Sequence, residues 1–206
     1  MLPIGIGRLA TINRHRINAS AVFVWALFSF PVSLAWAQGA PPTPQSIASA
    51  IREKQYDRAV ELARQALKAT PQDVQILTLE ALALKELGQA RDALAAFQQA
   101  LRIAPNYLAA LEGAAQIEYA AGSDGAIPLL DRLLRLRPDE PTAHAMRAVM
   151  AWKQRDCPTA VPHFERSRPV IASQPDALRE YGICLVRLNR PEAAAPVFQQ
   201  IVSGNP

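Results

Sequence analysis

The feature that most constrains the fold of this chain is an alanine that recurs at a nearly fixed interval. Its successive spacings are 34, 33, 34 and 34 residues, and its members are Ala59, Ala93, Ala126, Ala160 and Ala194. Four residues after each one stands a further apolar residue, namely Ala63, Phe97, Leu130, Phe164 and Phe198. A fixed period of this length indicates an array of short units that hide their apolar faces against one another.

Each unit is predicted to be a pair of short helices joined by a tight turn. In the second unit, Leu77 and Leu84 belong to an apolar stripe with the period of a helix, and Gly88 follows as a stop signal. A second apolar stripe covers residues 92–103, and Pro105 ends it. Half of the residues are hydrophobic and only 6% are aromatic, which is typical of packed helices rather than of a disordered chain.

The repeat extends over most of the chain. We expect five hairpins, at about 45–71, 74–105, 108–138, 141–172 and 175–206. A proline-rich linker at residues 38–44 precedes them. The fourth hairpin departs from the pattern, because His144 replaces an early apolar residue and Pro169 is expected to stop the second helix prematurely.

Residues 1–37 are predicted to be a cleaved signal peptide. A basic start is followed by an apolar run from Ile17, and Ala35 and Ala37 stand in the small-x-small arrangement that precedes cleavage. We therefore expect an exported protein, periplasmic or secreted. The alternative is that residues 17–37, which are just long enough to span a bilayer, stay in place as an inner-membrane anchor.

The charge of the chain argues against a nucleic-acid partner. The sequence pI is about 9.4, but Arg8, Arg14 and Arg16 lie in the leader. Of 22 lysines and arginines, 19 remain beyond it against 18 acidic residues. A nearly neutral body has no basic footprint for a phosphate backbone.

The repeat resembles the tetratricopeptide repeat family. In the second hairpin the family pattern is matched by Leu77, Ala81, Leu84, Ala93, Phe97, Ala100 and Pro105. In the fifth it is matched by Leu178, Tyr181, Gly182, Leu185, Ala194, Phe198 and Pro206. The resemblance implies an all-α, right-handed α-solenoid. It also implies a non-catalytic scaffold for protein–protein interaction, the alternative being a membrane-anchored structural subunit of an envelope assembly.

The family binds partners on a concave surface formed by the first helix of each hairpin. Mapped onto this chain, the expected partner-binding residues are Leu79, Leu82, Tyr119, Met146, Val149, Trp152, Arg179 and Arg187. The same mapping adds Lys85, Glu112, Gln116, Lys153 and Ile183. The carboxylate clamp of the family's chaperone-binding members is absent from the matching positions. We expect a bound peptide or helix, with Arg179 and Arg187 selecting acidic or C-terminal features; alternatively, Trp152 and Met146 only pack between repeats.

Few residues offer other chemistry. In the family register, Cys157 and Cys184 fall at the same end of the array, so a disulfide between them is expected in an oxidising compartment, the alternative being two buried thiols. His144 and His163 have no further ligands at metal-binding spacing, and His144 is expected to be a half-buried helix contact. No catalytic motif is recognisable, so we expect neither an enzyme nor a cofactor.

The last hairpin is expected to present an apolar end. Phe198, Ile201 and Val202 lie on its second helix, with no further polar helix after them. Such an end is either tolerated because it is small, or buried by self-association or by a partner.

Overall fold

The computed structural model describes residues 41–204, and all regular structure in that part of the chain is helical. The helices are α1 (Pro44–Arg52), α2 (Tyr56–Ala69), α3 (Val74–Glu86), α4 (Ala90–Ile103), α5 (Leu108–Ala120), α6 (Ala126–Leu136), α7 (Pro141–Lys153), α8 (Cys157–Arg166), α9 (Arg168–Ile171), α10 (Pro175–Arg187) and α11 (Pro191–Ser203). The predicted signal peptide, residues 1–37, lies outside the described residues. Among the described helices, none has the length and apolar character needed to cross a bilayer.

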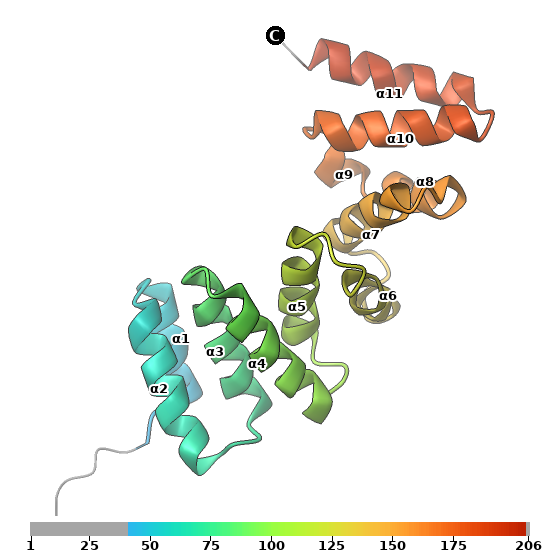
Figure 1. The fold of residues 1–206 in the computed structure, drawn as a ribbon. Helices are drawn as coiled ribbons and strands as arrows, with labels where there is room; N and C mark the ends of the chain where they lie inside the picture. The colour runs from blue at the N-terminus through green and yellow to red at the C-terminus, as the bar shows by residue number, and fades with distance from the viewer. Residues whose placement is uncertain (1–40, 205–206) are drawn as a thin grey trace, which may run out of the picture. The chain divides into compact units, whose positions relative to one another are not determined.

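The helices form consecutive hairpins, which confirms the predicted all-α solenoid (Figure 1). The pairs are α1–α2, α3–α4, α5–α6, α7–α8 and α10–α11. The second helix of each hairpin also packs against the first helix of the next one. First helices contact each other directly as well, α3 with α1 and α5, and α7 with α10. Each hairpin therefore depends on its neighbours to bury its apolar faces.

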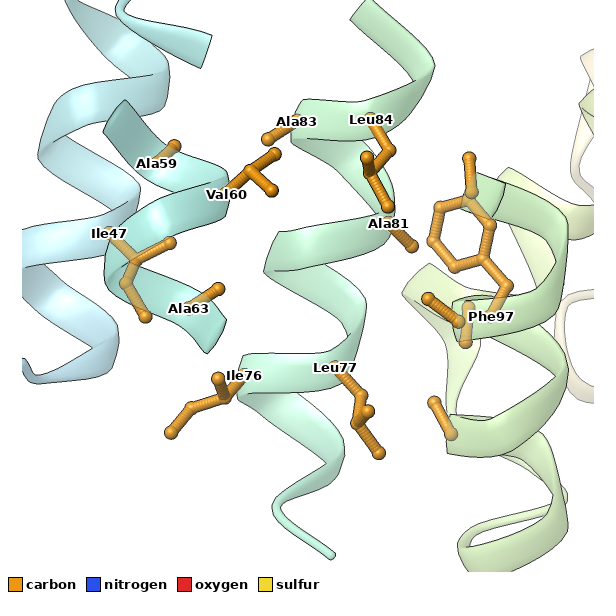
Figure 2. Packing of buried hydrophobic residues seen from close by; sticks show 14 of the residues in the cluster. Ile47, Ala59, Val60, Ala63, Ile76, Leu77, Ala81, Ala83, Leu84 and Phe97 are labelled. Atoms are coloured by element: carbon orange, nitrogen blue, oxygen red, sulfur yellow. The ribbon is translucent and has the colours of Figure 1, made fainter. Parts of the chain in front are cut away.

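The recurring alanines lie at the centres of the helix contacts. All five are buried, with at most 2% of their surface exposed. Their small side chains let the helix backbones approach closely, and Phe97 fills the space beside Ala81 (Figure 2). The contact is close enough that a β-carbon on Gly113 of α5 would overlap the Phe97 ring. The sequence period therefore reports the packing directly.

Every hairpin turn has a residue in the left-handed backbone conformation at the same position, just after the first helix. Positive φ angles occur at Lys54, Gly88, Gly122, Arg155 and Asn189, one after each first helix. The N–H group of the following residue bonds back into the helix, as from Gln89 to the Leu84 carbonyl at 2.9 Å. This is the Schellman arrangement that closes a helix and reverses the chain. At Lys54 and Arg155 a residue with a β-carbon takes a conformation that favours glycine.

The second helix of the fourth hairpin is broken close to Pro169. Helix α8 ends at Arg166, and the short α9 follows after Ser167. Ser167 is fully buried, and its hydroxyl donates a hydrogen bond to the Phe164 carbonyl at 3.1 Å. Proline lacks the N–H that would continue the helix, so the chain bends here. The pattern then resumes with α10.

The apolar end of the last hairpin is smaller than the sequence suggests. Phe198 turns toward Gly182 of α10, where a β-carbon would come within 2.6 Å of the ring. Ile201 is partly buried as well. Val202, at 77% exposure, is the largely exposed member of this group.

Candidate functional site

The residues expected to bind a partner lie on the first helices of the last four hairpins. Leu79 and Leu82 belong to α3, Tyr119 to α5, Met146, Val149 and Trp152 to α7, and Arg179 and Arg187 to α10. We call these eight residues, together with Lys85, Gln116 and Lys153, the first-helix surface. On α3, α5 and α7 the members are three or four residues from one another, so each of these helices presents them on one side, whereas the two members on α10 are eight residues apart.

The first-helix surface is graded from buried to exposed. Met146 is only 9% exposed and belongs to the core between α5 and α7. Tyr119 and Trp152 are partly buried, each packed on one side against a core cluster. Arg179 and Arg187 are exposed. Met146 therefore acts in packing, whereas the two aromatic side chains keep part of their surface accessible.

Cations of the next hairpin lie over both aromatic rings. The Lys153 ammonium is 5.8 Å from the centre of the Tyr119 ring, and the Arg187 guanidinium is 5.0 Å from the centre of the Trp152 ring. At these distances a cation is attracted to the electron-rich face of the ring. Each contact joins one first helix to the next, α5 to α7 and α7 to α10. Sequence reasoning placed these residues on one surface but did not find these pairings.

The two arginines of α10 differ in their surroundings. Arg179 forms an ion pair with Asp176 at 2.6 Å on the same helix, whereas Arg187 forms none with the described carboxylates. Between them, burial and then the Asp176 charge raise the pKa of the Glu180 carboxyl, against the effect of Lys153. Burial and the Glu180 charge also raise the pKa of Tyr119. Glu180, Lys153 and Tyr119 therefore act on one another across α5, α7 and α10.

Two cavities open beside the first-helix surface. One, of about 210 Å³, lies between α5, α6 and α7, with Met146, Gln116 and the Glu112–Arg137 ion pair, at 2.9 Å, among its lining groups. The other, of about 510 Å³, is mostly apolar, and its lining consists of Lys85, Ala90, Gln116, Ile117, Ala120 and Ala121. Two of these lining residues are joined by a hydrogen bond, which Lys85 donates to Gln116 at 2.9 Å. Of the eight expected binding residues, Met146 alone lines either cavity.

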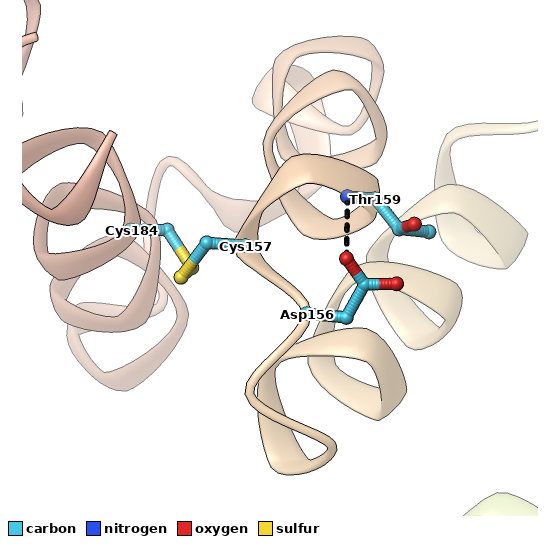
Figure 3. The surroundings of a disulfide bond; sticks show 4 residues. All are labelled: Asp156, Cys157, Thr159 and Cys184. Atoms are coloured by element: carbon cyan, nitrogen blue, oxygen red, sulfur yellow. Dashed lines mark hydrogen bonds between the residues drawn. A yellow bond between two sulfur atoms is a disulfide. The ribbon is translucent and has the colours of Figure 1, made fainter. Parts of the chain in front are cut away.

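The two cysteines are joined in the structure, between α8 and α10 (Figure 3). Their Cα atoms are 5.1 Å apart, within the usual range for a disulfide, and both side chains are buried. Beside them, Asp156 accepts a hydrogen bond from the Thr159 N–H at 3.1 Å and caps α8. Hydrogen bonds with Thr159 lower the pKa of this carboxyl. The disulfide bond and the Asp156 cap together fix the start of α8.

The two histidines form a pair between α7 and α8, in which His144 is buried and His163 is partly buried. His144 is 1% exposed, so the expectation of a half-buried contact is wrong. Its Nε2 is 2.7 Å from the Pro138 carbonyl oxygen and must donate to it, so in the neutral ring Nδ1 accepts from Nδ1 of His163 at 2.8 Å. Full burial is tolerated because both ring nitrogens have partners. In the described part of the chain no three His, Cys, Asp or Glu residues gather as metal ligands.

Comparison with known proteins agrees with this architecture. Tetratricopeptide repeat models match residues 74–107, 122–169 and 151–206. Solved structures of MamA have the same fold. MamA AMB-1 is 18% identical, with a TM-score of 0.68, over 79% of this chain and 96% of that one. MamA from Desulfovibrio magneticus RS-1 is 16% identical, with a TM-score of 0.66, over 78% of this chain and 91% of that one. No curated protein matches the sequence.

Proposed function

The chain belongs to the tetratricopeptide repeat family, and on that basis we propose that it is a non-catalytic scaffold that holds a peptide or helical segment of another protein on its first-helix surface. Arrays of this family serve protein–protein interaction, so the partner class follows from the fold. The position of the binding site is our proposal. It rests on the side chains of α5, α7 and α10.

The observation that carries the proposal is the pair of partly exposed aromatic side chains, Tyr119 and Trp152. They stand on successive first helices, α5 and α7, and a cation at the end of the next first helix lies over each ring, Lys153 over Tyr119 and Arg187 over Trp152. Large aromatic groups with one buried side lose little conformational freedom on binding and often contribute most of the affinity of an interface. An inserted segment would cover them together.

We further propose that the scaffold works outside the cytoplasm. The support is the leader sequence at residues 1–37 and the disulfide between Cys157 and Cys184, a type of bond that persists in oxidising compartments. N-terminal sequencing of the native protein tests this directly. A mature chain that begins near Gln38 supports export with cleavage, whereas a retained leader supports the anchored subunit, and a cytosolic protein contradicts both.

Self-association through α11 would have to rest mainly on Val202.

A double substitution, Trp152→Ala with Tyr119→Ala, tests the binding surface. Partners are recovered from native envelope extracts on the full chain and quantified by mass spectrometry, with circular dichroism to check that the variant is folded. We expect the specific partners to be lost. Tyr56→Ala is the control, because Tyr56 is a partly buried tyrosine of α2 outside the first-helix surface. Retention of every partner by the folded double variant would place binding elsewhere.

A further inference from the structure

We propose that Lys153 and Arg187 are the recognition groups of the first-helix surface and that they bind the carboxylates of an acidic, extended segment of the partner. This proposal rests on the proposed function and gives it a partner chemistry. The two residues occupy equivalent places at the ends of successive first helices, α7 and α10, 34 residues apart. The repeat therefore presents the same charge twice.

The aromatic rings hold these cations without neutralising them. Lys153 lies over Tyr119 and Arg187 over Trp152, yet both cationic side chains are exposed. Neither forms an ion pair or a side-chain hydrogen bond with another residue of the described chain. A ring face restricts the cation's position but does not satisfy its N–H donors, which number three in lysine and five in arginine. Both cations are thus positioned in advance for charged acceptors, which lowers the entropy cost of binding.

Other charges nearby do not supply those acceptors. Arg179 and Asp176 neutralise each other at 2.6 Å on the exposed side of α10. Glu180 is the acidic residue whose charge interacts with that of Lys153. Its carboxyl is half-buried, however, and its Oε2 has no hydrogen-bond partner among the described residues. Burial and Asp176 raise the pKa of this carboxyl, against the effects of Lys153 and Arg179, and it forms no ion pair with Lys153 among the described residues. The ends of α7 and α10 therefore keep positive charge for a partner.

The spacing of the helices sets the spacing of the partner's acids. Helices in direct contact, as α7 and α10 are, have axes about 8–10 Å apart. A segment in the extended polyproline II conformation advances about 3.1 Å per residue and completes a turn every three residues, so two carboxylates three residues apart lie on the same side, about 9 Å apart, and match this distance. We therefore expect an Asp or Glu, two intervening residues and another Asp or Glu, with apolar residues beside them to cover Tyr119 and Trp152.

A randomised peptide library selected on the full chain tests the proposal without knowledge of the partner. The expected result is enrichment of peptides with two acidic residues three apart. A synthetic peptide of that pattern, labelled with a fluorophore, should then bind about tenfold more weakly to the Lys153→Ala, Arg187→Ala variant. Lys68→Ala with Arg91→Ala is the matched control, since both residues are exposed cations of other helices and their loss changes the net charge equally.

The outcomes separate the two proposals. Enrichment of neutral or basic peptides, or acidic peptides that bind the Lys153, Arg187 variant as well as the control, would overturn the acidic partner and leave the scaffold function standing. No enrichment of any peptide would count against the scaffold function itself. Raising the salt concentration should strongly weaken the binding of the acidic peptide, because its contacts with Lys153 and Arg187 are exposed to solvent and are therefore screened.

Discussion

The first and last parts of the array solve the same packing problem with different side chains. From α1 to α5 the core is one continuous apolar cluster in which alanine predominates and Phe97 is the largest buried residue. From α7 to α11 the helices bury a comparable cluster, but they also carry a disulfide, a histidine pair and a cation over an aromatic ring. The repeat pattern is kept closely in the first part and departs in the second, at His144 and Pro169.

The difference shows where specific bonds replace regular packing. In the last part three pairs of neighbouring helices have a link of their own: the histidine pair joins α7 to α8, the disulfide joins α8 to α10, and Arg187 over Trp152 joins α7 to α10. In the first part the polar links between helices lie at the surface, such as the Arg64–Glu80 ion pair at 3.2 Å, in which the arginine is exposed and the glutamate is partly buried. Exposed pairs of this kind contribute little to stability. The first part should therefore depend on packing, and the last part on packing and bonds together.

The largest effect is expected at Phe97, in the part that depends on packing. Phe97→Ala removes a fully buried ring that fits against Ala81 and Gly113, so it should lower the free energy of unfolding by about 4 kcal/mol. Chemical denaturation measures the loss. Leu94→Ala on the same helix is the control and should cost less, because Leu94 is only partly buried. A loss at Phe97 below that at Leu94 would contradict the comparison.

The next effect is expected at the disulfide, in the part held by bonds. The disulfide closes a loop between cysteines 27 residues apart in sequence, which limits the freedom of the unfolded chain. Removing it with Cys157→Ala and Cys184→Ala should lower the free energy of unfolding by about 3.5 kcal/mol. Hydrogen exchange should become faster in α8–α11 and stay unchanged in α1–α4. A thiol reductant should destabilise the parent chain and leave the double variant unaffected. Equal exchange rates in α8–α11 of the two proteins would show that the bond adds nothing to this part.

The sequence was sufficient for the architecture because the architecture repeats. The alanine period located each close helix contact, and the buried alanines of the structure occupy those contacts. The register of the family that the chain resembles placed Cys157 and Cys184 at the same end of the array, where the structure joins them. The first inference needed only the spacing along the chain, whereas the second also needed the family resemblance.

Features specific to one hairpin could not be obtained in that way. The pairing of His144 with His163 depends on which sides of α7 and α8 meet, and the expected half-buried histidine is in fact fully buried. The left-handed turns at Lys54 and Arg155 carry no glycine to announce them. For the cations over Tyr119 and Trp152, the only available signal was the 34-residue spacing of Lys153 and Arg187.

The smallest effect is expected from the histidine pair, and it depends on pH. Burial, followed by the charges of His144 and Arg147, lowers the pKa of His163 from 6.5 to about 4, with Arg166 acting in the same direction and Asp131 in the opposite one. The folded chain therefore binds this proton less readily than the unfolded chain does. Stability should fall as the pH drops from about 6.5 toward 4, and the loss should be modest because His163 is only half-buried.

A conservative substitution separates this effect from general acid sensitivity. His163→Asn puts an amide N–H donor near the place of Nδ1, so the hydrogen bond to His144 can persist while the titrating group is gone. Unfolding free energies measured between pH 4 and 6.5 should then vary less for the variant than for the parent chain. A steeper or unchanged pH dependence in the variant would mean that His163 does not titrate against folding. In that case the histidine pair would stabilise the last part of the array through its hydrogen bonds alone, without any dependence on pH.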